Sequence, residues 1–213
     1  MPDELGAAQE HWGTQPRTGG FHRGFDVVCA GLGLVPLAPL FCVIAALIKL
    51  DDYGPIVYRQ PRMGRDFRTF HVIKFRSMSV GADRKGPLTA PGDRRITRVG
   101  RYLREYKLDE LPQLFNVLRG EMQLVGARPE VRQYVEMFPS QYAVLLRERP
   151  GITDPASLAY RHEDQILSGG RIEEQYVAEI LPAKLKLSLE YQKRRSLGSD
   201  IRVLWQTICG LPA

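Results

Sequence analysis

Apolar residues fill one long stretch near the N-terminus and recur afterwards at helix-like or strand-like spacing. The stretch Val27 to Ile48 has 22 residues and no formal charge, and about 20 such residues are enough for a helix to cross a membrane. The preceding residues 1–20 are rich in Gly, Pro, Gln and Thr and lack apolar periodicity. We therefore expect a disordered tail over 1–20 and a membrane element over 21–50.

Two prolines, Pro36 and Pro39, lie near the middle of the apolar stretch. Each removes a backbone donor and crowds the preceding turn, so together they favour a break over a gentle curve. Positive residues favour the cytoplasmic side of a membrane, and here they flank both ends. These flanks favour a re-entrant helix hairpin over a straight span, and a buried core helix remains a third alternative. The flanking residues are Arg17 and Arg23 before the stretch, and Lys49, Arg59, Arg62, Arg65 and Arg68 after it.

The remaining chain, 51–213, is predicted to form a cytosolic domain of the α+β class, mainly helical, with short strands. Alternation of apolar and polar residues predicts a strand within 55–64 and a second within 67–78, followed by a loop from Ser79 to Asp93. Helical spacing of apolar residues predicts a helix over 96–106. This helix carries a basic face at Arg94, Arg98, Arg101 and Arg104.

A second helix follows almost at once. Its apolar residues, at positions 111, 114, 115 and 118, share one face, and Gly120 is a typical C-terminal cap. Pro112 is tolerated only in a first turn, so the helix should begin close to Asp109. A short strand is expected over 122–126.

Further helices are predicted toward the C-terminus, over 130–147 and, as one or two helices, over 172–197, with a turn at 149–153. The last segment, 199–209, has Trp205 and three aliphatic residues on one stripe. A tryptophan with basic neighbours is typical of an interfacial amphipathic helix lying on a membrane, although internal packing explains the same stripe equally well.

Charge is unevenly distributed in this chain. From Tyr53 to Leu108 there are 14 Lys or Arg and 4 Asp or Glu, whereas the whole chain has a formal charge of +6. Such a block attracts nucleic acid, phosphate-bearing small molecules or an anionic lipid surface. No RNA- or DNA-binding signature accompanies it, so no nucleic-acid partner is expected. The three cysteines form no disulfide or zinc-binding pattern.

Two adjacent carboxylates, Asp109 and Glu110, are the strongest candidates for chemistry. At a helix N-terminus, backbone N–H groups and the helix dipole keep a carboxylate ionised and oriented. A plain capping role explains the pair on local evidence. The functional alternative is a nucleophile beside a metal ligand, because carboxylates attack phosphorus and Mg²⁺ takes one or two carboxylates with phosphate oxygens. Arg104 and Arg128, close on either side, suit phosphate recognition.

Four strings resemble one known family. They are KFRSM at 74–78, LDELPQLFNVLRGEM at 108–122, LVGARPE at 124–130 and RPGIT at 149–153. They are similar to the bacterial sugar transferases, monotopic phosphoglycosyl transferases that begin the assembly of cell-surface glycans, and the resemblance runs from about residue 21 to 159. It implies a re-entrant membrane hairpin broken at Pro36 and a catalytic domain on the cytoplasmic face of the bacterial inner membrane.

The resemblance also implies roles for single residues. Asp109 matches the nucleophile, which attacks the β-phosphate of a UDP-sugar, releases UMP and holds the phosphosugar until polyprenyl phosphate accepts it. Glu110 matches its partner, which supports Mg²⁺. Arg104 and Arg128 match phosphate-binding residues, and Lys74 lies in a matching motif.

This chain departs from the family pattern in two places. Ala127 stands where the family usually has the first proline of Pro-Arg-Pro. The residues after 153 read Asp-Pro-Ala-Ser-Leu in place of the common Gly-Trp-Ala-Gln-Val, and Arg161, His162, Glu163 and Asp164 follow with no assigned role. A catalytically inert membrane adaptor that binds anionic lipid is the alternative to an enzyme. A homo-oligomer is compatible with either function.

Overall fold

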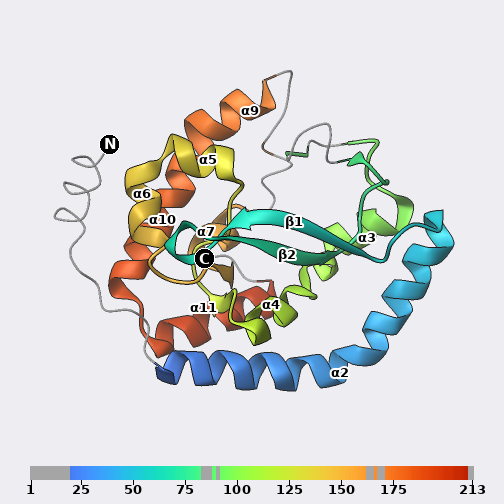
Figure 1. Ribbon diagram of the computed structural model, residues 1–213, viewed down its shortest axis with the longest axis horizontal. Coiled ribbons are helices and arrows are strands. Elements are labelled where there is room, and N and C mark those ends of the chain that lie inside the picture. Colours follow the sequence, from blue (N-terminus) through green and yellow to red (C-terminus); the bar gives the residue numbers. More distant parts are fainter. Residues whose placement is uncertain (1–19, 83–87, 90–91, 162–165, 167–170, 211–213) are drawn as a thin grey trace.

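The computed structural model describes residues 20–82, 88–89, 92–161, 166 and 171–210. The predicted tail over 1–19 and parts of the predicted loop over 79–93 lie outside these residues, as do three of the four residues 161–164. Short strands occupy the centre of the molecule, helices surround them, and one long helix runs along the lower rim (Figure 1). The mainly helical α+β class predicted from the sequence is confirmed.

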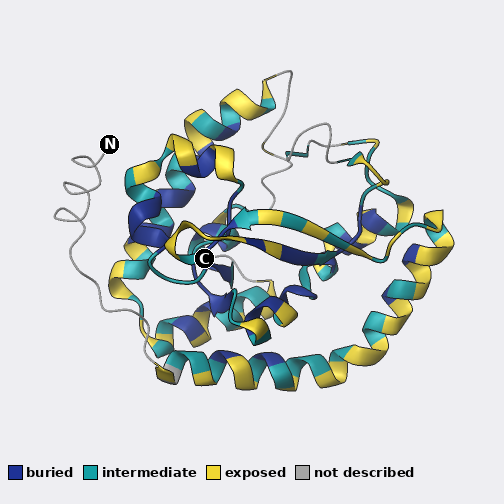
Figure 2. Cartoon of the chain, in the orientation of Figure 1, coloured by how far each residue is buried: buried dark blue, intermediate teal, exposed yellow. Residues whose placement is uncertain are grey.

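The long helix is α2, Gly20–Asp52. It continues through Pro36 and Pro39 and is bent into an arc, so the expected break in the helix is absent (Figure 1). A proline removes one backbone hydrogen bond and pushes the preceding turn aside, and the flanking turns here keep the helix continuous around that loss. Helix α2 is long and apolar enough to cross a membrane, and only 11% of its most apolar window is buried. This exposure argues against the buried core helix (Figure 2).

The last turn of α2 is joined to the rest of the domain by two aspartates. Asp52 forms a bidentate ion pair with Arg76, just after the second strand. Asp51 accepts a hydrogen bond of 3.1 Å from the backbone N–H of Val99. Val99 belongs to helix α3, Arg98–Glu105, which is capped by Thr97. The predicted helix over 96–106 is thereby confirmed.

Strands β1, Val57–Met63, and β2, Thr69–Phe75, form an antiparallel hairpin, as the alternating pattern predicts. The short helix η1, Arg65–Phe67, makes the connection. In the register Tyr58 pairs with Lys74 and Arg62 with Phe70. Cross-strand partners share a face of the sheet and side chains alternate along a strand, so Tyr58, Gln60 and Arg62 lie on the same face as Lys74.

Helix α4, Gln113–Arg119, ends at Gly120, whose φ of 81° is the left-handed conformation expected of a glycine cap. Its Asn116 is fully buried and joins three segments. The Asn116 carboxamide accepts from Ile73 N at 3.0 Å and donates to His71 O at 2.8 Å and to Glu121 at 2.7 Å. Asn116 therefore fixes α4 against β2.

The predicted short strand after α4 is confirmed as β3, Gln123–Val125. It pairs in parallel with β4, Gly151–Thr153, so the predicted turn at 149–153 is wrong. The two backbones approach closely, because a Cβ on Gly151 would lie 2.1 Å from the nitrogen of Gly126. Helix α7, Pro155–Ala159, follows and is capped by the buried Asp154, which also binds Ser188.

Helices of the C-terminal half cover one end of the hairpin. The helix expected over 130–147 is two helices, α5, Arg132–Met137, and α6, Pro139–Leu145, because Pro139 cannot continue the first and instead begins the second. The segment over 172–197 contains α9, Ile172–Gln175, the π-helical turn η4, Tyr176–Ile180, and α10, Leu181–Arg194. Helix α11, Leu197–Cys209, confirms the final predicted helix.

Candidate active site

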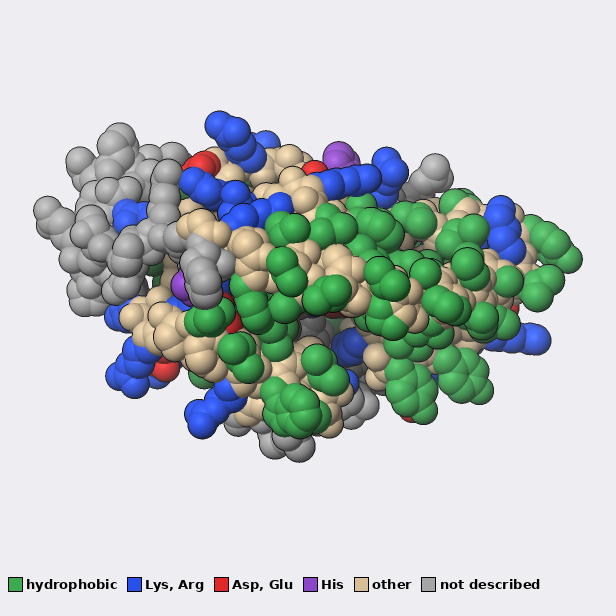
Figure 3. Space-filling model, turned by 90° about the horizontal axis from the view of Figure 1, so that it is seen from below, with side chains coloured by type: hydrophobic (Ala, Val, Ile, Leu, Met, Phe, Trp, Pro, Cys, Tyr) green, Lys and Arg blue, Asp and Glu red, His purple; other side chains and the backbone are tan. Residues whose placement is uncertain are grey.

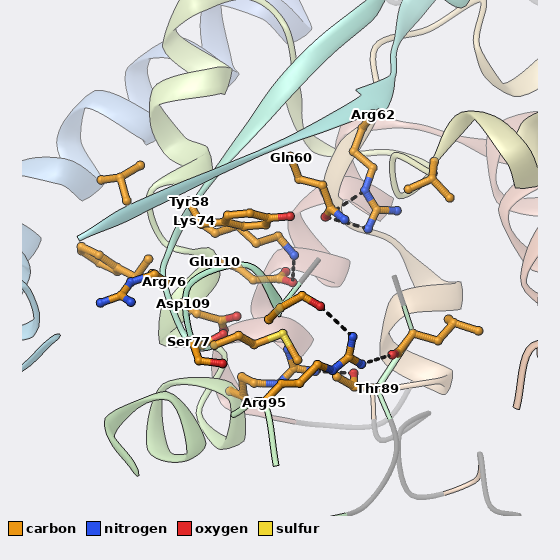
Figure 4. Close-up of a pocket in the computed structure, with 18 of the residues that line it drawn as sticks. Tyr58, Gln60, Arg62, Lys74, Arg76, Ser77, Thr89, Arg95, Asp109 and Glu110 are labelled. Atoms are coloured by element: carbon orange, nitrogen blue, oxygen red, sulfur yellow. Dashed lines mark hydrogen bonds and ion pairs between the residues drawn. The ribbon is translucent and has the colours of Figure 1, made fainter. Parts of the chain in front are cut away.

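A cavity of about 420 Å³ lies beside the hairpin, at the point where β1 and β2 meet the segments around positions 77, 109 and 128. Figure 4 shows polar side chains from these segments converging on it. All five of the predicted catalytic and phosphate-binding residues line this cavity: Lys74, Arg104, Asp109, Glu110 and Arg128. The structure thus brings together residues that span 54 positions of the sequence.

Asp109 and Glu110 lie on a single turn of 3-10 helix, η3, Leu108–Glu110. Helix α4 begins at Gln113, so Asp109 does not cap it, and the expected position at an α-helix N-terminus is wrong. Lys107, with φ 57°, has a left-handed conformation that turns the chain sharply out of α3. Both carboxylates line the same cavity, although successive residues of a 3-10 helix point about 120° apart.

The two carboxylates have very different surroundings. Asp109 is 6% exposed, and its Oδ1 has no hydrogen-bond partner among the described residues. Glu110 accepts from Lys74 Nζ at 3.0 Å and from Arg128 Nη1 at 2.9 Å, and Arg128 Nη2 binds its other oxygen. A carboxylate held by two cations is a stable structural anion, whereas an oxygen without a partner is available to a ligand.

The same contacts separate the pKa values of the pair. Burial, and then repulsion by Glu110, raises the pKa of Asp109 above its ordinary value. Burial alone would also raise the pKa of Glu110, but Arg128 and Lys74 hold it well below its usual range. Burial lowers the pKa of Lys74, against the opposing attraction of Glu110. Neighbouring carboxylates with pKa values moved apart are typical of sites in which each has a separate role.

Arg104 is positioned at the opposite wall of the cavity from the hairpin. Its Nη2 donates to Thr89 Oγ1 at 2.6 Å, and Thr89 also lines the cavity. Arg95 lies on the same side, where its guanidinium pairs with Asp93 and donates to the carbonyl of Leu88. Three cationic side chains at or near Asp109 therefore come from α3, β2 and the segment after β3.

Sequence reasoning missed several residues of the cavity, among them Gln60, Arg62, Glu130 and Tyr176. Gln60 accepts two hydrogen bonds from Arg62, the longer of them 3.2 Å. The available signal was the spacing of Tyr58, Gln60 and Arg62 at every second residue of a strand, which places them on one face. Glu130, the partner of Arg62, is 68 residues away, so no local sequence pattern indicated that the two residues pair.

The donor set of the cavity is compatible with a magnesium ion. Among the described residues no group of three or more His, Cys, Asp or Glu side chains converges on one point. Mg²⁺ needs fewer, since it commonly binds one or two carboxylates together with substrate phosphate oxygens and water. The buried Asp109 Oδ1 is the oxygen best suited to it, because both oxygens of Glu110 already accept from cations.

A wide apolar surface lies on one side of the molecule. Seen from below, hydrophobic side chains form a continuous band over α2, with Lys and Arg around its edges (Figure 3). Leu32 and Val35 of α2 are 69% and 74% exposed. On α11, Trp205 and Ile208 are 63% and 79% exposed, whereas Leu204 of the same stripe packs against the core, so internal packing explains only part of the stripe. Surfaces this apolar mark contact with a membrane or a protein partner.

Comparisons with known proteins identify the family of this chain. The family model "Bacterial sugar transferase" matches residues 18–211. The exopolysaccharide production protein ExoY of Sinorhizobium fredii is 36% identical over 98% of this chain and 90% of its own length. The undecaprenyl-phosphate glucose phosphotransferase of Komagataeibacter xylinus is 39% identical, and the UDP-N-acetylgalactosamine-undecaprenyl-phosphate N-acetylgalactosaminephosphotransferase of Aeromonas hydrophila is 36% identical.

Each of the latter two matches 87% of this chain, which spans only 35% and 42% of their respective lengths. The family model's match, residues 18–211, contains the whole cavity and α2. The family model covers most of the chain, and ExoY of Sinorhizobium fredii is 36% identical over nearly all of it, so the chain belongs to the bacterial sugar transferase family.

Proposed function

We propose that this protein transfers a sugar 1-phosphate from a UDP-sugar to polyprenyl phosphate, of the undecaprenyl type, and releases UMP. The reaction would be the first membrane step in assembling a bacterial surface glycan such as an exopolysaccharide. The single observation that carries the proposal is the buried Asp109 carboxylate, whose Oδ1 has no partner among the described residues, beside a Glu110 that two cations hold in place. The relatives named as undecaprenyl-phosphate phosphotransferases support it.

The asymmetry of the acidic pair assigns the two roles. Asp109 attacks the β-phosphorus of the UDP-sugar, and an Asp109 O–P bond forms. The bond from the β-phosphorus to the bridging oxygen breaks, and UMP leaves with that oxygen. A phosphate oxygen of polyprenyl phosphate then attacks the same phosphorus and displaces Asp109, which returns to its carboxylate. The product is polyprenyl diphosphosugar, and every atom is accounted for.

The cations of the cavity make attack by an anion on an anionic diphosphate feasible. Lys74 and Arg128 hold Glu110 away from acting as a competing nucleophile, and they present N–H groups where phosphate oxygens would lie. Arg104 adds a third positive charge from the opposite wall. Mg²⁺, held by the Asp109 carboxylate with phosphate oxygens, would further offset the charge of the diphosphate.

Membrane attachment through α2 supports a lipid acceptor. The bend of α2, a helix that contains Pro36 and Pro39, would let its two arms enter one leaflet and return, with both basic ends on the cytoplasmic face of the inner membrane. Trp205 and Ile208 of α11 would rest at the membrane interface. A polyprenyl phosphate keeps its phosphate at that interface, within the same layer as the cavity.

The transfer is tested by UMP release. Protein in nanodiscs, given polyprenyl phosphate, Mg²⁺ and a panel of UDP-sugars, is expected to release UMP from at least one donor and to form the matching lipid-linked phosphosugar. Omission of the lipid should limit UMP to about one equivalent per enzyme, because the aspartyl intermediate then has no acceptor. Binding to liposomes without turnover of any donor would favour the inert adaptor instead.

The re-entrant arrangement is tested by labelling from one side. Single cysteines are introduced as Gly24→Cys and Tyr53→Cys, near the two ends of α2, in a chain whose native cysteines are replaced by serine. Both positions are exposed. A maleimide that cannot cross membranes should label neither cysteine in intact spheroplasts and both after lysis. Labelling of one end alone in intact spheroplasts would mean that α2 spans the bilayer.

A further inference from the structure

The segment that carries Arg128 is fastened to strand β1 by a buried ion pair. Arg62 Nη1 donates to the Glu130 carboxylate at 2.9 Å and to the carbonyl of Pro129 at 3.3 Å. The backbone N–H of Met63 donates to the carbonyl of Glu130 at 2.9 Å. These three bonds hold the two residues that directly follow Arg128 against the hairpin.

Glu130 is held from a second direction by the helical half of the domain. Its other oxygen accepts from the hydroxyl of Tyr176 at 2.8 Å, and Glu130 and Tyr176 are both buried. Tyr176 begins the π-helical turn η4, and Lys184 lies 5.5 Å from the centre of its ring. Single π-helical turns within longer helices frequently occur at functional sites. Burial would raise the pKa of Glu130, but Arg62 holds it below its ordinary value, so the pair is ionised.

The charge balance of this cluster indicates a positioning role. Arg62 and Glu130 neutralise one another, and Arg62 is further committed to Gln60. Lys74 and Arg128, in contrast, share the single carboxylate of Glu110 and keep a net positive charge for phosphate. The cluster lines the same cavity without adding charge to it.

The segment preceding Arg128 is held to β4 by backbone hydrogen bonds. The backbone N–H of Gly126 donates to the carbonyl of Thr153, and the carbonyl of Ala127 accepts from the N–H of Gly151, both at 2.9 Å. Alanine leaves its own φ free, where a proline would restrict it. The hydrogen bonds after Arg128 add a side-chain restraint, from the hairpin and the C-terminal helices, on where its guanidinium reaches Glu110.

We propose that Arg62, Glu130 and Tyr176 form a positioning cluster that fixes Arg128 against Glu110 for phosphate binding, an inference that rests on the proposed function. These three residues act through Arg128 and need not touch the reacting phosphorus. The cluster joins the hairpin, the Arg128 segment and the C-terminal helices at one point. Displacement of a phosphate-binding group by about 1 Å can cost up to a hundredfold in rate, so small shifts of this segment matter.

The test is a double-mutant cycle read by UMP affinity, with isothermal calorimetry in nanodiscs. Glu130→Gln and, as a milder change, Tyr176→Phe are each made in the natural chain and in an Arg128→Lys background. With Arg128 present, Glu130→Gln should weaken UMP binding about tenfold, and in the Arg128→Lys background by less than twofold, because coupled residues are not additive. Glu136→Gln, in the exposed pair with Arg132, is the matched control and should change nothing.

The outcomes separate this inference from the proposed function. Equal losses in both backgrounds, or unchanged UMP affinity in a folded Glu130→Gln protein, would overturn the positioning role even if the enzyme turns over. If Glu130→Gln does not fold, the Tyr176→Phe cycle decides by the same criterion. Failure of the natural chain to bind UMP would overturn both, whereas UMP binding with the expected coupling but no turnover would overturn only the transfer reaction.

Discussion

Replacing Asp109 by asparagine is expected to lower UMP release by at least about 10³-fold, because an amide cannot form the acyl-phosphate on which the transfer depends. The substitution keeps the shape of the side chain, so UDP-sugar binding should change far less than the rate. Initial rates and donor affinity are measured on the same nanodisc preparation. Glu105→Gln, an exposed acid on α3, serves as the control and should keep its activity. Full activity of the Asp109→Asn protein would refute the assignment of the nucleophile.

The same substitution is expected to stabilise the protein at pH 7. The pKa of Asp109 is raised in the folded state, so between its ordinary value and the raised value the folded protein binds more protons than the unfolded chain. Stability therefore falls as pH rises through that interval, and the penalty is complete above it. Asparagine does not titrate and avoids the penalty, so the variant should be the more stable protein.

Denaturant unfolding of both proteins between pH 4 and 8 measures this effect. The advantage of Asp109→Asn should be greatest at neutral pH and shrink as the pH falls. An Asp109→Asn protein less stable than the natural chain at pH 7 would show that the carboxylate is satisfied by contacts other than those described. A gain in stability with loss of activity is the usual mark of a residue kept for function.

Replacing Glu110 by glutamine is expected to cost about 3 kcal/mol of folding free energy, because it leaves Lys74 and Arg128 without their shared counter-charge in a largely buried site. Activity should fall by roughly a hundredfold as both cations lose their positions. Inorganic pyrophosphate should restore more stability to the variant than it adds to the natural chain, since its oxygens replace the missing carboxylate. Thermal unfolding with and without pyrophosphate measures the difference.

The control for this experiment is Glu190→Gln, an exposed glutamate on α10. It should show neither the loss of stability nor the response to pyrophosphate. If Glu110→Gln is as stable as the natural chain and still transfers the phosphosugar, Glu110 is not the residue that organises the cations. The two substitutions in the acidic pair thus have opposite expected effects on stability, which no general effect of removing a negative charge can produce.

Local patterns predicted the elements whose signals are contained within a few residues. Alternation on the hairpin strands, helical spacing in α3 and α11, and the glycine at the end of α4 all depend on neighbours in the sequence. The parallel pairing of β3 with β4 joins segments about 30 residues apart, and periodicity does not encode a partner. The division between α5 and α6 was readable at Pro139, a signal that the amphipathic pattern concealed.

The candidate site likewise has features that local sequence patterns predict and features that they do not. The adjacent pair Asp109 and Glu110 could be found because it is contiguous and flanked by arginines. Their different roles followed from the family resemblance and not from the local residues, because the asymmetry comes from Lys74 on β2 and from burial of one oxygen. The predicted helix start at Asp109 failed because Lys107 takes a left-handed conformation that only the folded chain reveals.

The contacts at the end of α2 link the depth of this helix in a lipid bilayer to the distance of the cavity from the membrane surface. Asp52 forms an ion pair with Arg76, two residues after Lys74. Asp51 accepts a hydrogen bond from the first turn of α3, the helix that carries Arg104. Both walls of the cavity are thus fastened to one turn of one helix. If α2 lies in a bilayer, the cavity would move with it as a rigid body. A phosphate at the lipid surface would then meet Asp109 at one fixed distance from the membrane. The rate of the proposed reaction would then depend on bilayer thickness. This dependence would act through Asp51 and Asp52, which do not touch the substrate.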